Sequence, residues 1–132
     1  MPIEYRIDYD WNLVRTRCSG EVTLQQVLDH FDRLEQDPDR PPRLHVLLEL
    51  TGLVTAPRSD ELQAVARRIN RLADLRFGLC AILVDRDLIF GIARIFVAFA
   101  EGRFEAVQVF KSAVAAEAWL AEGIANDTGE GP

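Results

Sequence analysis

The sequence is poor in the features that mark exported, membrane-spanning or metal-binding proteins. Its two cysteines, Cys18 and Cys80, lie far apart and form neither a CxxC motif nor a Cys/His cluster. We therefore expect two reduced thiols in the core rather than a disulfide or a metal site. The longest apolar stretch, 88–100, is interrupted by Arg94 and is too short to span a bilayer. No signal segment is visible at the amino terminus, so we expect a cytoplasmic protein without an integral membrane segment.

Positive charge is also scarce. The 132 residues include 15 Lys and Arg against 21 Asp and Glu, which gives a formal net charge of -6. Domains that bind nucleic acid normally present a basic face to the phosphate backbone, so we expect no nucleic-acid partner. The chain length and an apolar fraction of 48% are typical of one soluble domain with a real core.

Motifs of catalysis and nucleotide binding are missing as well. The sequence has no G-x-G-x-x-G, P-loop or H-E-x-x-H motif. Neither His30 nor His45 lies near a serine elbow or an activated cysteine. Asp85 and Lys111 end two predicted strands, where receiver domains hold Mg²⁺ and a phosphoryl group, but the first parallel strand supplies no acidic pair. We predict no enzyme activity, no catalytic residue, no metal and no cofactor.

What the sequence does contain is a regular succession of strand and helix patterns. Residues 3–19 alternate polar and apolar side chains in two strands joined at 10–12, and a capping box at 23–26 opens an amphipathic helix. Three units of a short apolar strand and a helix follow, with Ser59 and Ser112 expected to cap the second and the last helix. This order predicts a mostly parallel sheet with right-handed crossovers and helices packed on it.

The order of elements and the end of the chain resemble the SpoIIAA-like family. Val109–Ser112 (VFKS) followed by Ala116–Leu120 (AEAWL) is similar to the last strand and helix of such proteins. The resemblance covers Ile3 to about Gly123. It implies a STAS-type α/β fold, shared more loosely by CRAL-TRIO lipid-transfer domains, in which a β-hairpin precedes a helix and three β-α units. We expect a STAS-like domain over 1–124, of the kind found in small bacterial proteins of unassigned role, and a flexible tail over 125–132.

Ser59 is the candidate phosphorylation site that the resemblance implies. Anti-sigma-factor antagonists of this family carry an Asp-Ser-x-Gly-like motif where the second helix begins, and Ser59 occupies that place. Here Arg58 precedes the serine, and no glycine follows at the expected spacing. The alternative interpretation is that Ser59 is a plain helix cap.

The predicted helix over 88–100 is apolar on nearly all sides, although a helix that packs on a sheet needs to bury one face only. Four residues can face the sheet: Ile89, Ile92, Ala93 and Phe96. Five apolar residues then need another cover: Leu88, Phe90, Ile95, Val97 and Phe99. They predict a subunit interface or a groove for an apolar ligand, because large exposed apolar patches usually mark contact sites. Burial within the monomer is the third interpretation.

Four arginines lie on or next to the predicted second helix: Arg58, Arg67, Arg68 and Arg71. They form either a solvated face or a basic surface for an acidic partner or a lipid headgroup.

Our leading hypothesis is a non-catalytic, STAS-like interaction or regulatory module that binds a protein partner and forms a homodimer. The alternative is a carrier of a lipid or other small apolar ligand, with the helix over 88–100 as a lid. An internal apolar pocket would favour the carrier, and a flat symmetric patch would favour the dimer.

Overall fold

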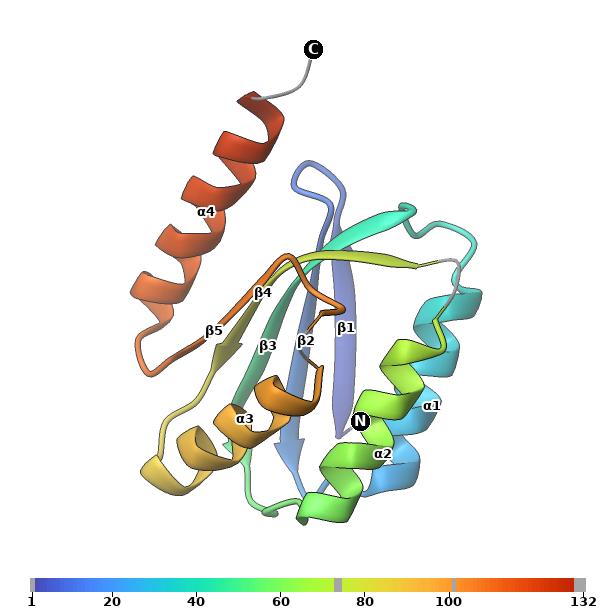
Figure 1. Cartoon of the computed structure of the whole chain (residues 1–132), viewed down its shortest axis with the longest axis vertical. Helices are drawn as coiled ribbons and strands as arrows, with labels where there is room; N and C mark the ends of the chain where they lie inside the picture. Colours follow the sequence, from blue (N-terminus) through green and yellow to red (C-terminus); the bar gives the residue numbers. More distant parts are fainter. Residues whose placement is uncertain (1, 73–74, 101, 130–132) are drawn as a thin grey trace.

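The computed structural model describes residues 2–72, 75–100 and 102–129 and shows one sheet with helices on both faces (Figure 1). The strands are β1 (Ile3–Asp8), β2 (Leu13–Gly20), β3 (Arg43–Leu53), β4 (Arg76–Leu83) and β5 (Ala106–Phe110), and the helices are α1 (Leu24–Gln36), α2 (Ser59–Asn70), α3 (Asp87–Ala100) and α4 (Ala113–Gly129). This is the predicted succession of a hairpin, a helix and three strand–helix units. Helix α4 runs past the expected domain boundary at residue 124, and 130–132 of the expected tail lie outside the described residues.

The strands lie in the sheet in sequence order, β1-β2-β3-β4-β5. β1 pairs antiparallel with β2, and each later pair of neighbours is parallel. Crossovers between parallel strands are right-handed, so a sheet that grows in one direction receives α1, α2 and α3 on the same face. Helix α4 follows the last strand and packs against β4 and β5 on the opposite face (Figure 1). The predicted fold class, a mostly parallel α/β sheet with helices, is confirmed.

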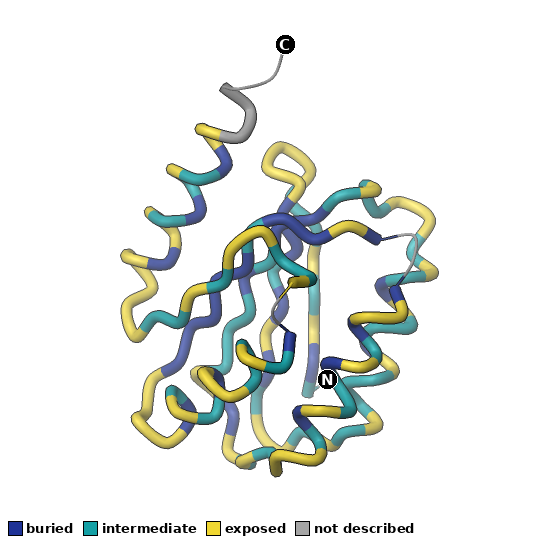
Figure 2. The backbone as a smooth tube through the Cα atoms, viewed as in Figure 1, coloured by how far each residue is buried: buried dark blue, intermediate teal, exposed yellow. Residues whose placement is uncertain are grey.

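The alternation of side chains divides the strands into two apolar faces. The α4 face packs through a cluster of buried residues: Leu13, Leu47, Ala81, Ala116, Leu120 and Ile124. The opposite face is made by residues one position away in each strand, such as Val14, Val46 and Ile82, because successive side chains of a strand point to opposite sides. Strand β4 is buried along most of its length (Figure 2), as expected for a strand covered on both faces.

Arg103, in the loop after α3, caps the carboxyl end of α2 with its side chain. Its guanidinium donates hydrogen bonds to the carbonyl oxygens of Ile69, Leu72 and Leu75, at 3.2, 3.0 and 3.2 Å. A helix leaves its last carbonyls without partners, and a cation is favourable at this negative end of the helix dipole. The guanidinium also lies over the Phe77 ring. Arg103 thus ties α2, β4 and the loop after α3 together.

His45 stabilises an irregularity between β3 and β4. The register of the two strands shifts between Leu44 and Val46. The Leu79 N–H donates a hydrogen bond to Nδ1 of the buried His45 at 3.0 Å, so the ring takes the acceptor role that a carbonyl has in a regular ladder. A Cβ on Gly78 would lie 2.4 Å from that Nδ1. Position 78 therefore has to be glycine for the ring to stay where it is.

Candidate functional site

A cavity of about 450 Å³ lies between the sheet and the three helices on its face, α1, α2 and α3. Its floor is made by alternate residues of the central strands, including Val14, Thr16, Cys18, Val46, Leu48 and Ile82. Pockets that hold small molecules have volumes of roughly 300–1,000 Å³ and mostly apolar linings. Both properties of this cavity fall within that description.

The roof of the cavity comes from the three helices. Helix α3 contributes the four residues that the sequence predicts to face the sheet: Ile89, Ile92, Ala93 and Phe96. Val27 of α1 and Val65 of α2 add further apolar surface. The helices pack side by side, α1 on α2 and α2 on α3 (Figure 1). The cavity is therefore covered by a layer that depends on helix–helix contacts.

One rim of the cavity is formed at the carboxyl ends of β2 and β3, the edge at which open α/β sheets commonly bind ligands. Thr55 of the loop after β3 accepts a hydrogen bond from the Val22 N–H of the loop after β2, at 3.2 Å. Both residues line the cavity, and so do Arg58 and Glu61 at the start of α2. Among the described lining residues, formal charge is confined to these last two. The interior is therefore free of ionised side chains.

Two cysteine thiols line the interior. Burial raises the pKa of Cys18 to about 11 and that of Cys80 to about 12, so both are protonated at neutral pH and are poor nucleophiles. Strand β3 separates their strands, β2 and β4, and two strand spacings of about 4.8 Å exceed the reach of a disulfide. Both cysteines are free and buried, as the sequence predicts.

His30 of α1 is a buried polar residue of the lining, only 6% exposed. Its Nδ1 is buried and has no hydrogen-bond partner among the described residues. The centroids of the Tyr5 and Phe31 rings lie 5.4 and 5.3 Å from that of its own ring, but the Tyr5 hydroxyl donates to Asp37 at 2.8 Å. Burial and, secondarily, the charge of Arg33 lower the pKa of His30 to about 4. The imidazole is therefore neutral near pH 7, and its Nδ1 lacks the partner that buried polar atoms normally have.

We expect mild acid to destabilise the protein through His30. The pKa of its ring is near 6.5 in an unfolded chain and about 4 in the folded protein. Between these values the unfolded chain binds a proton that the folded chain does not, so the free energy of unfolding falls as the pH drops from 6.5 to 4. At about 1.4 kcal/mol per pH unit, the loss is about 3 kcal/mol. Urea titrations across this range measure it.

The His30→Phe variant is the control for this acid effect. It should lose much less stability over the same pH range, because its ring binds no proton. An acid loss in the variant as large as that of the wild type would show that other groups cause it.

The structure separates the five apolar residues of α3 that are predicted to form an interface or a ligand-facing surface. Leu88 is 62% exposed and Ile95 is 46% exposed. Phe90 and Val97 are half-buried against the core, and Phe99 is half-buried as well. None of the five lines the cavity. α2 and β5 pack beside α3 and leave Leu88 and Ile95 on its outer side. The role of these residues in an interface stays a prediction.

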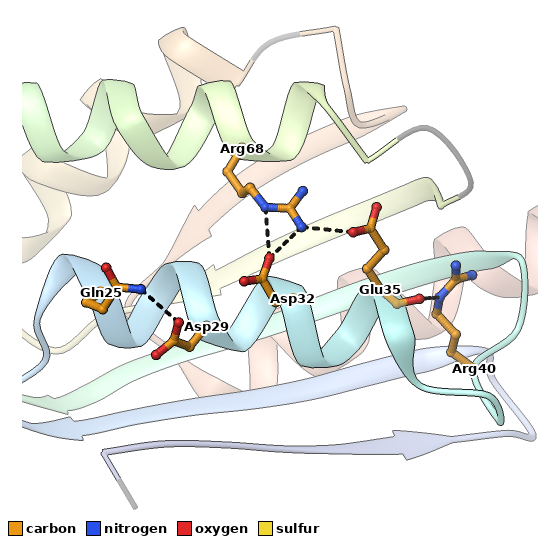
Figure 3. A network of polar contacts seen from close by, with 6 residues as sticks. All are labelled: Gln25, Asp29, Asp32, Glu35, Arg40 and Arg68. Atoms are coloured by element: carbon orange, nitrogen blue, oxygen red, sulfur yellow. Dashed lines mark hydrogen bonds and ion pairs between the residues drawn. The ribbon is translucent and has the colours of Figure 1, made fainter.

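Arg68, one of the four arginines of the predicted basic surface, forms ion pairs within the monomer. Its guanidinium donates to Asp32 at 2.6 Å and to Glu35 at 2.9 Å, two carboxylates of the neighbouring α1 (Figure 3). This network joins α1 to α2 and neutralises the charge of Arg68. Of the four arginines predicted to form a basic surface, Arg58, Arg67 and Arg71 are exposed and Arg68 is half-buried. The role of this surface in binding a partner stays a prediction.

Ser59 is exposed at the first position of α2. The N-cap is Arg58, whose N–H donates to the Glu61 carboxylate at 3.0 Å. The predicted cap is thus wrong by one residue, because a glutamate from the first turn takes over the capping contact. Ser112 does cap its helix, since its hydroxyl accepts the Ala115 N–H at 3.1 Å. Phosphorylation of Ser59 stays a prediction.

The sequence predictions omit Thr16 and His30 as cavity residues, although a signal for both is present. Thr16 is a polar residue at an apolar position of an alternating strand, between Val14 and Cys18. His30 falls on the inner side of α1, one residue before Phe31 of its apolar stripe. Polar side chains at buried positions are the pattern that could have indicated a ligand site.

Among the described residues, no group of three or more His, Cys, Asp or Glu side chains is placed to hold a metal ion. In the same part of the chain, no helix is long and apolar enough to cross a membrane.

The sheet topology, helix placement and element order define a SpoIIAA-like fold. A crystal structure of an uncharacterized protein from the DUF3478 family with a SpoIIAA-like fold, from Shewanella loihica PV-4, is similar to this chain with a TM-score of 0.59 and 18% sequence identity. The similarity covers 89% of this chain and 91% of that chain, which confirms the predicted fold. No protein-family model and no curated protein matches the sequence.

Proposed function

We propose that the protein is a non-catalytic carrier that binds a small apolar molecule or a lipid chain in the cavity, with α3 as a lid. The observation that carries this proposal is the cavity itself, with its volume of about 450 Å³ and its aliphatic and aromatic lining. A lining of this kind binds by removing apolar surface from water, and the few polar groups in it set the orientation of the ligand.

The size of the cavity argues that it has an occupant. Apolar side chains that face unfilled space lose the dispersion contacts of a packed core, and the cavity leaves about 450 Å³ without protein atoms. Water is a poor filler, because each molecule needs two to four polar partners and the interior offers mainly Thr16 and His30. An apolar ligand would restore the missing contacts.

Helix α3 is the part of the roof best suited to move. Its amino end is held by the Lys111–Asp87 ion pair and by a hydrogen bond from Arg86 to the Leu53 carbonyl. Ion pairs exposed to solvent stabilise by at most about 1 kcal/mol, so the larger cost of displacing this end is the exposure of the buried Ile89, about 1.5–3 kcal/mol. Arg103 holds the loop after the other end to α2. We therefore propose that the amino end of α3 lifts to admit the ligand.

Self-association is a second candidate function. Leu88 and Ile95 are exposed two turns apart on the outer side of α3, and a symmetric contact between two copies would cover them. Such a homodimer would place both lids in its interface, so the two candidate functions are compatible. Two side chains make only a small patch, so we favour ligand binding in the cavity over self-association.

Native mass spectrometry of freshly purified protein tests both functions. We expect a reproducible small-molecule adduct that is lost when the protein is unfolded, extracted with solvent and refolded. The extracted protein should then take up about one equivalent of the apolar dye N-phenyl-1-naphthylamine, with the rise in fluorescence that an apolar site causes.

Two outcomes would speak against the carrier. Protein without an adduct that also fails to take up the dye would exclude it. A dimer with neither adduct nor dye binding would favour the interaction module instead.

A further inference from the structure

We infer that the cavity selects apolar ligands that end in an uncharged hydrogen-bonding group, such as a hydroxyl, and that Thr16 and His30 bind this group. The inference rests on the proposed function and narrows it to a class of ligand. It follows from where the polar groups of the cavity lie, from the partners they lack and from the position of charge in the lining.

Thr16 and His30 lie at the same side of the cavity. Both line it, and both are more than nine-tenths buried, with exposures of 4% and 6%. Tyr5 of β1 is the register partner of Thr16 of β2, and side chains of such partners share a face of the sheet. The Tyr5 ring packs edge-on against the His30 ring. Thr16 and His30 are therefore both neighbours of Tyr5, on the face of the sheet that α1 covers.

The protein itself leaves His30 unsatisfied. Nδ1 has no partner among the described residues, and the hydroxyl of the adjacent Tyr5 is committed to Asp37. A half-turn of the ring about its Cβ–Cγ bond exchanges Nδ1 with Cδ2 and Nε2 with Cε1, since the two orientations have the same shape. A neutral imidazole offers one donor and one acceptor, and a threonine hydroxyl offers both roles as well. Together they match the donor and acceptor of a ligand hydroxyl.

An ionised ligand group has no suitable place in the cavity. The interior lining holds no charged side chain that could pair with it, and an unpaired buried charge is strongly unfavourable. At the rim, the single positive charge of Arg58 is outnumbered by the negative charges of Asp60, 3.1 Å away, and Glu61, and these carboxylates repel a further anion. The lining therefore favours alcohols over carboxylates of the same chain length.

The test measures binding of 1-decanol, decane and decanoate by displacement of N-phenyl-1-naphthylamine from the extracted protein. We compare the wild type with Thr16→Val, which keeps the shape of the side chain, with His30→Phe and with His30→Gln, which keeps a hydrogen-bonding group. Thr16→Val and His30→Phe should each weaken decanol binding about 5- to 10-fold, the effect of one lost hydrogen bond, and leave decane unchanged. His30→Gln should retain part of the decanol affinity.

The matched control is Thr51→Val, because Thr51 is exposed and does not line the cavity. Thermal unfolding of each variant shows that it is folded before binding is compared. This inference is contradicted, but the proposed carrier function is not, in either of two cases. In the first, the ratio of the affinities for decanol and decane is the same in all variants. In the second, decanoate binds more tightly than decanol. If the dye does not bind the extracted protein, the proposed function is contradicted, and this inference fails with it.

Discussion

Replacing Leu48 by tryptophan should abolish uptake of the apolar dye and at the same time stabilise the ligand-free protein. Leu48 lies at the centre of the cavity floor, between its register partners Thr16 and Ile82. A larger ring there fills space that is otherwise empty and gains about 1–2 kcal/mol from burial, while it removes room for a ligand. We expect a loss of dye affinity of at least tenfold, measured by fluorescence, and a higher midpoint in urea.

The matched control is the same substitution one residue earlier. Leu47 points to the other face of the sheet, where it is fully buried against α4. In that tightly packed place tryptophan should destabilise by about 1–3 kcal/mol and leave dye binding intact in the folded protein. Equal destabilisation by Leu47→Trp and Leu48→Trp would show that the space under α1, α2 and α3 is as well filled as the core under α4.

Replacing Gly78 by alanine should lower the free energy of unfolding by about 2–6 kcal/mol. The new Cβ would lie 2.4 Å from Nδ1 of His45 and 3.1 Å from a carboxylate oxygen of Glu105, so the ring has to move. Overpacking of this kind costs about 1–3 kcal/mol, and the Leu79 N–H loses its buried acceptor at about 1–3 kcal/mol more. Urea unfolding monitored by circular dichroism gives the value.

Two further variants separate the clash from a general intolerance of glycine substitution. Gly91→Ala on the outer side of α3 should stabilise by about 0.5–1 kcal/mol, because its Cβ meets no atom within 4 Å and alanine favours a helix. His45→Ala should make Gly78→Ala much less harmful, since neighbouring residues couple in a double-mutant cycle. Additive effects of the two substitutions would contradict the proposed contact.

The fold was predictable because its elements follow local rules. Alternation in 3–19 indicates the hairpin, and the capping box at Thr23 begins α1 where the sequence places it. The all-parallel remainder follows from apolar strands separated by amphipathic helices. The exception is the start of α2, where a serine next to acidic residues predicts a cap, whereas the Glu61 side chain bonds one residue earlier, to the Arg58 N–H.

The site was predictable only in part, because a packed apolar residue and one that faces a cavity look the same in a sequence. The four residues of α3 that line the cavity were assigned to the right side of the helix, but their pattern predicts contact with the sheet rather than space above it. The pairing of Arg68 with Asp32 joins residues of two different helices, and no local pattern encodes it. A volume between elements depends on how far apart they pack, which composition and periodicity do not determine.

The cavity also has a consequence for the abundance of the protein in a cell. If the occupant completes the core, a free ligand concentration of 100 times Kd adds about 2.7 kcal/mol to the stability of the folded chain. Differences of about 1–2 kcal/mol are enough to change steady-state levels several-fold, because proteases remove chains while they are unfolded. A ligand that fills the cavity would thus make the amount of this protein follow the supply of that ligand.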